Sequence, residues 1–185
     1  MKTPPGEIGK TILLTSRAPA QLHEVNAGIY MFDRSDFDQL SSDQQICSAA
    51  RSECRGLYYV TYPNDAFRYS ESQETIRITR APKRHGEDGL KFWLQAEYLD
   101  WRPESDSRFP QHVSDAKFEK IPEAVFNQMI VDRTIDLIAP LKQPLHEPTG
   151  FVGALLMYSM KTDFIVSLFA EYEDEYIHFH WYTIS

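Results

Sequence analysis

The C-terminal part of the chain, residues 151–184, constrains the fold more than any other feature of the sequence. It holds three apolar and aromatic segments, "FVGALLMYS", "DFIVSLFAE" and "EYIHFHWYTI". Apolar runs of this length that are rich in aromatic and β-branched residues are typical of strands. The second and third segments are joined by "YEDE", which is short enough for a β-hairpin, and strands joined in this way run antiparallel. The sequence therefore predicts an antiparallel sheet that ends in a C-terminal β-hairpin.

Strand-like patterns also occur earlier in the chain. "GLYYVTY" (residues 56–62) ends at the turn signal "PND", and "ETIRITR" (residues 74–80) alternates isoleucine with polar residues. "LKFWLQAEYLDW" (residues 90–101) fits either a strand or a short helix. Because it follows the glycine-containing loop "APKRHGEDG", we favour a strand that pairs with the one before that loop. The polar, proline-containing residues 102–120 are predicted to form a long surface loop. Two short apolar runs predict further strands, at residues 10–16 and 26–32.

Two main helices are predicted between these strands. Ser42 and Gln45 have the spacing of a capping box, in which side chains at the start of a helix satisfy backbone N–H groups, and Gly56 suits the end of a helix. These signals place the first helix at about residues 43–54. The second helix, at about residues 122–138, begins with a proline, carries apolar residues at helical spacing and ends before another proline.

The composition indicates one folded domain. The chain has 185 residues, of which 42% are hydrophobic and 25% are charged, and this balance is typical of globular proteins rather than of disordered ones. It contains no recognisable internal repeat, linker or low-complexity segment. The sequence therefore predicts a single α+β domain over residues 1–185, with a mostly antiparallel sheet, two main helices and a C-terminal β-hairpin.

Net charge and hydropathy argue against several classes of function. The formal net charge is −8, from 27 acidic and 19 basic residues, and phosphate backbones repel such a chain. No apolar run approaches the roughly 18 residues that a membrane span requires, and the first residues lack the apolar core of a signal peptide. We therefore expect a cytoplasmic protein that binds neither nucleic acid nor membranes. A cationic protein partner, in contrast, would be attracted to it.

His178 and His180 are the first candidates for chemistry. In a strand, both side chains lie on one face, about 6.5 Å apart, which is close enough for them to bind one metal ion. A catalytic zinc site needs a third ligand, and nothing in the sequence places the candidates His146 or Glu171 nearby. The same spacing is expected for the polar or partner-facing surface of an ordinary strand, and we favour this interpretation. A metal-dependent enzyme that uses the two histidines is kept as an alternative.

An acidic run with neighbouring tyrosines lies at the predicted turn between the last two strands. Its plainest interpretation is a solvated hairpin turn. The alternative is a negatively charged knob with aromatic anchors, which would suit the cleft of a basic enzyme. On this hypothesis, the partner-binding residues are Glu171, Tyr172, Glu173, Asp174, Glu175 and Tyr176.

The sequence contains no recognisable catalytic motif, such as a nucleophilic serine between glycines. We therefore predict a protein that is not an enzyme and needs no cofactor. Our first hypothesis is an acidic inhibitor, of the kind that bacterial immunity proteins represent, which neutralises a cationic toxin or enzyme by blocking its active site. A small-ligand-binding or structural subunit is a further alternative, which a deep apolar pocket or self-association would favour.

Overall fold

The computed structural model of the chain describes residues 42–51, 56–69, 73–83, 88–99, 108–141, 148–158 and 164–184. Its α-helices are α2 (Asp43–Arg51), α3 (Gly89–Tyr98), α4 (Phe109–Asp115) and α5 (Glu123–Thr134). Its strands are β1 (Tyr58–Tyr62), β2 (Glu74–Pro82), β3 (Lys117–Ile121), β4 (Phe151–Tyr158), β5 (Ile165–Tyr172) and β6 (Glu175–Thr183), and a short 3₁₀ helix, η2 (Asn64–Ala66), follows β1. The strands predicted at residues 10–16 and 26–32 lie outside the described residues.

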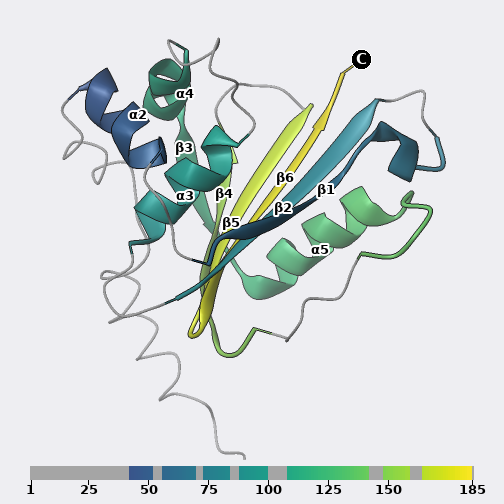
Figure 1. Cartoon of the computed structure of the whole chain (residues 1–185). Coiled ribbons are helices and arrows are strands. Elements are labelled where there is room, and N and C mark those ends of the chain that lie inside the picture. Colours follow the sequence, from purple (N-terminus) through teal and green to yellow (C-terminus); the bar gives the residue numbers. More distant parts are fainter. Residues whose placement is uncertain are drawn as a thin grey trace, which may run out of the picture.

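All of the described strands belong to one sheet (Figure 1). Its strand order is β1-β2-β6-β5-β4-β3, and each neighbouring pair runs antiparallel. β5 and β6 form a hairpin whose turn is Glu173 and Asp174. The predicted α+β class, with an antiparallel sheet and a C-terminal β-hairpin, is confirmed. β6 lies inside the sheet, between β2 and β5, although it is the last strand of the chain.

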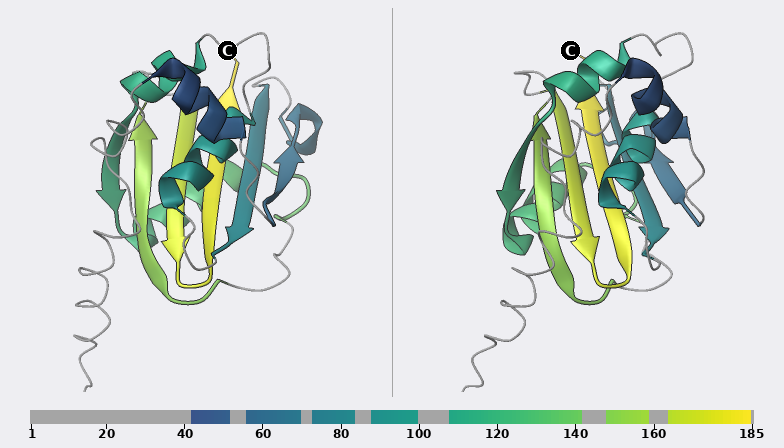
Figure 2. Two further views of the ribbon diagram at one scale, coloured as in Figure 1. Left: turned by 60° about the vertical axis from the view of Figure 1, so that its left-hand side comes forward. Right: turned by 90° about the vertical axis from the view of Figure 1, so that its left-hand side faces the viewer.

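Helices cover both faces of the sheet and give three layers (Figures 1 and 2). The helices α2, α3 and α4 lie on one face, and α5 lies on the other. Because side chains alternate along a strand, β6 presents His178 and His180 to the face under α3, while Phe179 and Trp181 lie on the α5 face. Both faces of β6 are therefore covered. None of the helices in the described residues is long and apolar enough to cross a membrane.

The first predicted helix, at residues 43–54, is present as α2. The backbone N–H of Gln45 donates to the Ser42 hydroxyl oxygen at 3.3 Å, as the proposed capping residue requires. α2 is described as far as Arg51, and residues 52–55 lie outside the described ranges. The predicted start of this helix is therefore confirmed.

The second predicted helix is α5, which is shorter than the expected span of residues 122–138. It ends at Thr134, because the residues that follow pair with residues 66–68, at the end of η2 and directly after it. The backbone N–H of Ile138, for example, donates to the carbonyl oxygen of Ala66 at 2.9 Å. Such long-range pairing satisfies backbone groups that a longer helix would have used, and the periodicity of the sequence does not reveal it.

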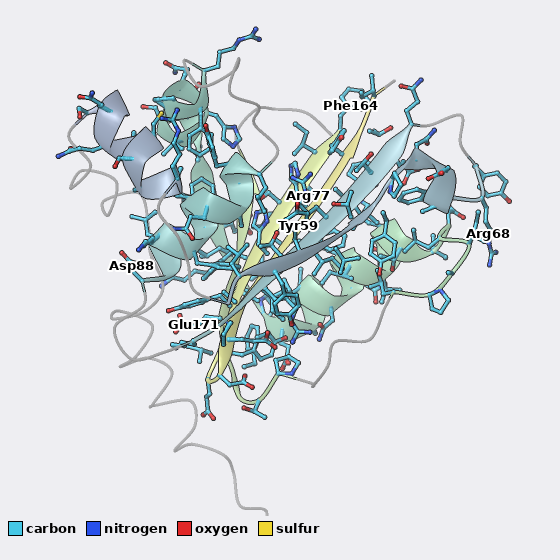
Figure 3. All side chains as sticks on the ribbon, viewed as in Figure 1. Tyr59, Arg68, Arg77, Asp88, Phe164 and Glu171 are labelled. Carbon is cyan, nitrogen blue, oxygen red and sulfur yellow. The ribbon has the colours of Figure 1, made fainter. Side chains whose placement is uncertain are left out.

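The prediction of a strand at residues 90–101 was wrong, because this segment forms the helix α3. The side chain of Asp88 caps it by accepting a hydrogen bond from the backbone N–H of Leu90 at 2.9 Å (Figure 3). Nearly the whole helix is buried, including every residue from Phe92 to Glu97. A helix that is apolar all round lacks the periodicity that would distinguish it from a strand.

The prediction of a continuous surface loop at residues 102–120 was also wrong. The segment contains α4, whose Phe109 and Val113 are fully buried, and most of β3. β3 is a short edge strand with charged, exposed side chains, which protect a sheet edge from pairing with other chains. A charged edge strand has the composition of a loop, and this explains the error.

Candidate functional site

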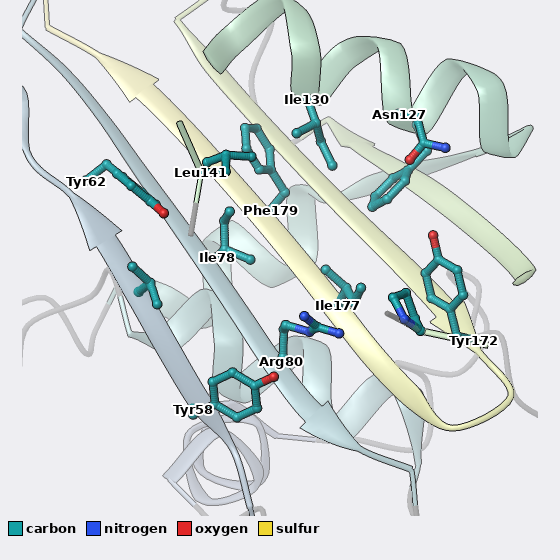
Figure 4. A pocket seen from close by; sticks show the side chains of 13 residues that line it. Tyr58, Tyr62, Ile78, Arg80, Asn127, Ile130, Leu141, Tyr172, Ile177 and Phe179 are labelled. Carbon is teal, nitrogen blue, oxygen red and sulfur yellow. The ribbon is translucent and has the colours of Figure 1, made fainter. Parts of the chain in front are cut away.

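A pocket with a volume of about 480 Å³ lies between α5 and the sheet (Figure 4). Strands β1, β2 and β6 form one side of it, and α5 forms the other. Most of the wall is apolar, and the apolar side chains that line it include Val60, Ile78, Phe126, Ile130, Ile177 and Phe179.

The position of α5 explains why this pocket exists. α5 packs against β4, and Phe126 is its buried anchor. β1 and β2 lie at the opposite side of the sheet, separated from β4 by β6 and β5. Val60 and Ile78, which are paired in the register of β1 and β2, line the cavity on the α5 face, since the body of the helix lies over the other strands. One helix is too narrow to cover this face of the sheet completely.

Polar groups enter the pocket from Tyr58, Arg80, Asn127 and Tyr172 (Figure 4). Burial raises the pKa of the Tyr172 phenol, and the negative charge of nearby Glu123 raises it further. The phenol therefore stays neutral at physiological pH and offers a hydroxyl group. The pocket combines a broad apolar wall with a small number of polar groups, which is the usual composition of a small-molecule site.

Arg80 forms a buried ion pair at one end of the pocket. Its Nε donates to Oε2 of Glu175 at 2.8 Å, and its Nη2 donates to the other carboxylate oxygen. Burial lowers the pKa of the guanidinium, whereas charge interactions with Tyr58, Asp174 and Tyr172 oppose this shift. An arginine remains protonated in proteins, so the two side chains carry opposite charges that compensate each other.

The six residues predicted to bind a partner do not form one exposed surface. Glu171 is fully buried and pairs with Lys83, and burial raises its pKa although the pairing opposes that shift. Tyr176 is also fully buried, and its ring stacks on that of Phe92 with the centroids 5.5 Å apart. Tyr172 is buried and lines the pocket. The expected exposure was therefore wrong for these three residues.

Glu175 is the fourth of these residues to be buried, through its ion pair with Arg80. Only the turn itself reaches solvent: Glu173 is exposed, and Asp174 is partly exposed. Asp174 also has a structural contact, because its Oδ1 accepts a hydrogen bond from the backbone N–H of Thr149 at 3.0 Å. Two acidic residues of the run, Glu171 and Glu175, are thus buried, and each pairs with a basic residue. They lie on either side of the two-residue tip.

The two candidate histidines are buried as well. The exposed fraction is 0% for His178 and 7% for His180, and their rings stack with centroids 6.1 Å apart. The interpretation of this face as a polar or partner-facing surface was wrong, because the predicted strand at residues 90–101 is in fact α3, which covers it. Of the suggested third metal ligands, Glu171 pairs with Lys83, and His146 lies outside the described residues.

His178 belongs to a buried hydrogen-bonded network with residues from α3, α4 and β5. Its Nε2 lies 2.9 Å from Oε1 of Glu97, and Nε2 of His112 lies 3.2 Å from the other oxygen, Oε2. The hydroxyl of Ser167 donates to Oε1 of Glu97 and lies 3.0 Å from Nε2 of His178. One carboxylate therefore connects two helices to the two central strands.

Glu97 is ionised in this network, although its exposed fraction is only 1%. Burial alone would raise its pKa, but hydrogen bonds from His112 and His178, together with charge interactions with His178 and His180, hold the pKa well below its usual range. An ionised carboxylate only accepts hydrogen bonds. Nε2 of both His112 and His178 must therefore carry a hydrogen.

The network is not arranged like a catalytic triad. In such a triad, the serine and the carboxylate contact different nitrogens of the histidine, so that one nitrogen can accept the serine proton. Here Ser167 and Glu97 both contact Nε2 of His178, which already carries a hydrogen. Within the described ranges, moreover, no group of three or more His, Cys, Asp or Glu side chains is placed to hold a metal ion. The geometry supports a structural role for this cluster.

The sequence indicated His178 as a candidate but did not indicate its partners Glu97 and His112. The spacing of His178 and His180 drew attention to β6, but Glu97 was assigned to a strand and His112 to a loop. The available signal was Glu97, an acidic residue within the largely apolar run "LKFWLQAEYLDW", because a buried carboxylate requires hydrogen-bond donors nearby. The pocket had no comparable signal, since its wall is assembled from four strands, a helix and two further segments of the chain.

Comparison of this chain with protein-family models, with curated proteins and with solved structures found no match.

Proposed function

We propose that this chain is a binding domain that holds a small, largely apolar ligand in the pocket between α5 and the sheet. The observation that carries the proposal is the apolar cavity of about 480 Å³, which has a few polar side chains in its wall. Pockets for small ligands generally have volumes of about 300–1,000 Å³ and this kind of lining.

The packing of the protein supports the proposal. Protein interiors are close-packed, and side chains beside an unfilled space lose favourable van der Waals contacts. The side chains of Ile78, Ile177 and Phe179 project into the cavity from the centre of the α5 face. A ligand in the cavity would restore such contacts and remove apolar surface from water, which favours binding.

The test of this proposal is a pocket-filling substitution on α5. We expect wild-type protein to bind the uncharged dye N-phenyl-1-naphthylamine, and Ile130→Trp to weaken this binding by about tenfold or more, because the indole would occupy the cavity. Val131→Trp is the matched control: it introduces the same side chain at the next position of the same helix, where the side chain is exposed. Fluorescence titration measures both affinities.

Equal loss of dye binding in both tryptophan variants would contradict the proposal, as would dye binding that neither variant affects. Circular dichroism and a urea denaturation curve for each variant establish that the fold is retained. A ligand that binds the pocket should also raise the melting temperature of the wild-type protein and of Val131→Trp, but not that of Ile130→Trp.

An inhibitor of a cationic protein is our second proposal, supported by the net charge of −8 and the exposed carboxylate of Glu173 at the hairpin tip. We expect Glu173→Lys to slow association with such a partner and to change the free energy of unfolding by less than about 0.5 kcal/mol, because the side chain is exposed. A pull-down from native lysate at low salt would supply the partner, and stopped-flow kinetics would measure association. A basic partner that associates equally fast with the wild-type protein and with Glu173→Lys would exclude this role of the hairpin tip.

A further inference from the structure

On the basis of the proposed ligand pocket, we infer that the ligand is uncharged and that Glu175 is the residue that excludes anions. Arg80 is the one charged side chain among the described residues that line the cavity. On its own, a buried guanidinium would attract a carboxylate or sulfonate group. The state of Arg80 therefore decides which ligands the pocket accepts.

Glu175 does not itself line the cavity, but it already pairs with the guanidinium that would attract an anionic ligand. Its two carboxylate oxygens accept hydrogen bonds from Nε and Nη2 of Arg80, which is the paired geometry of an arginine with a carboxylate. The side chains of both residues are almost completely buried. An anionic ligand that took over these two hydrogen bonds would deprive a buried carboxylate of the guanidinium that compensates its charge, at a large cost in free energy.

The other charges near this end of the pocket also repel anions. Asp174 interacts electrostatically with Arg80, and Glu123 interacts with Tyr172. Two carboxylates, Glu175 and Asp174, thus interact with Arg80, and a third, Glu123, acts on the neighbouring Tyr172. The pair of Lys83 and Glu171 does not alter this balance, because its two charges compensate each other.

A cationic ligand is also disfavoured. It would lose its hydration in an apolar cavity, where Arg80 repels it and both oxygens of Glu175 are already engaged. Neutral polar groups are available instead, from the hydroxyls of Tyr58 and Tyr172 and the amide of Asn127 (Figure 4). These groups suit a ligand with an apolar body and an uncharged hydroxyl or carbonyl group.

Two dyes that differ in one charged group test this inference. N-phenyl-1-naphthylamine and 1-anilinonaphthalene-8-sulfonate have the same ring system, but only the second carries a sulfonate. We expect the wild-type protein to bind the neutral dye at least about tenfold more tightly, and decan-1-ol to displace it at lower concentration than decanoate. If the affinities for the two dyes were equal and both were lost in Ile130→Trp, the inference about charge would be overturned, but the proposed ligand pocket would still be supported.

Substitution of Glu175 tests the role of this residue directly. We expect Glu175→Gln to free the charge of Arg80 and so to raise the affinity for the sulfonate dye, relative to the neutral dye, by about tenfold. Asp132→Asn is the control, because it removes one negative charge from the exposed side of α5 and should leave the ratio unchanged. An unchanged ratio in a folded Glu175→Gln protein would overturn the assignment of this residue.

If Glu175→Gln does not fold, as judged by circular dichroism, the comparison of the two dyes and of the alcohol with the carboxylate in wild-type protein decides the question. Failure of the wild-type protein to bind either dye would overturn the proposed function and this inference together. Binding of the neutral dye alone, in a manner that Ile130→Trp abolishes, would support both.

Discussion

Replacement of Glu97 by alanine is expected to lower the free energy of unfolding by about 3–5 kcal/mol. The substitution removes the shared acceptor of three donors, which are the hydroxyl of Ser167 and Nε2 of His178, both fully buried, and Nε2 of the partly buried His112. Each donor that loses its partner costs about 1–3 kcal/mol, although these costs are not additive within one network. Urea denaturation measures the change.

Lys91→Ala is the control for this prediction. Lys91 lies on the same helix, but its side chain is exposed, so we expect a change of less than about 0.5 kcal/mol. A similar small loss for Glu97→Ala would mean that the carboxylate does not hold α3 and α4 to the sheet. In that case, the network could not be the feature that stabilises this side of the protein.

The pH dependence of stability provides a second measurement on the same carboxyl group. The pKa of Glu97 is lower in the folded protein than in the unfolded chain, so its contribution is complete above the unfolded value and is lost as the pH falls through the folded value. Glu97→Gln keeps the shape of the side chain but cannot titrate. We therefore expect the difference in unfolding free energy between wild type and Glu97→Gln to shrink below about pH 4.5. A difference that stayed constant down to about pH 2.5 would contradict the ionised state of Glu97.

The parts of the fold that sequence patterns predicted are those in which local signals and tertiary structure agree. The hairpin of β5 and β6 combines apolar strands with a short turn, and the cap at Ser42 requires only residues nearby in the sequence. The prediction for the segment that forms α3 was wrong for the opposite reason. Its burial is a property of the three-layer arrangement, and the mostly apolar sequence of a helix that is buried nearly all round also fits a buried strand.

The candidate site was harder to predict because charge in the sequence does not distinguish exposed from paired residues. The run "EYEDE" looks like a solvated turn, yet Glu171 and Glu175 pair with Lys83 and Arg80, which lie far away in the chain. Such partners come together only when β2 adds to the edge of the hairpin. The pocket depends on an even less local property, because it exists only where α5 does not cover β1 and β2.

The ion pair of Arg80 and Glu175 gives the second large expected effect. Arg80→Met should lower the free energy of unfolding by about 3–5 kcal/mol, because it removes the guanidinium that compensates the buried charge of Glu175. Arg77→Met is the matched control on the same strand: Arg77 lies on the opposite face and is partly exposed, so we expect a loss of about 1 kcal/mol or less. Urea denaturation of the two variants compares them directly.

The double variant Arg80→Met/Glu175→Leu distinguishes the net contribution of the ion pair to the free energy of unfolding from the loss that follows when only one partner is removed. Replacement of both charges by apolar side chains removes the desolvation cost of both ions, so we expect the double variant to be within about 1 kcal/mol of wild type, well above either single variant. A double variant as unstable as the sum of the two single variants would show that the charges are not coupled. If the expected recovery occurs, the pair is not retained for stability, because apolar residues serve equally well. Because Arg80 lies in the wall of the pocket, the selection of the proposed ligand is then the property that we infer the two charges to control.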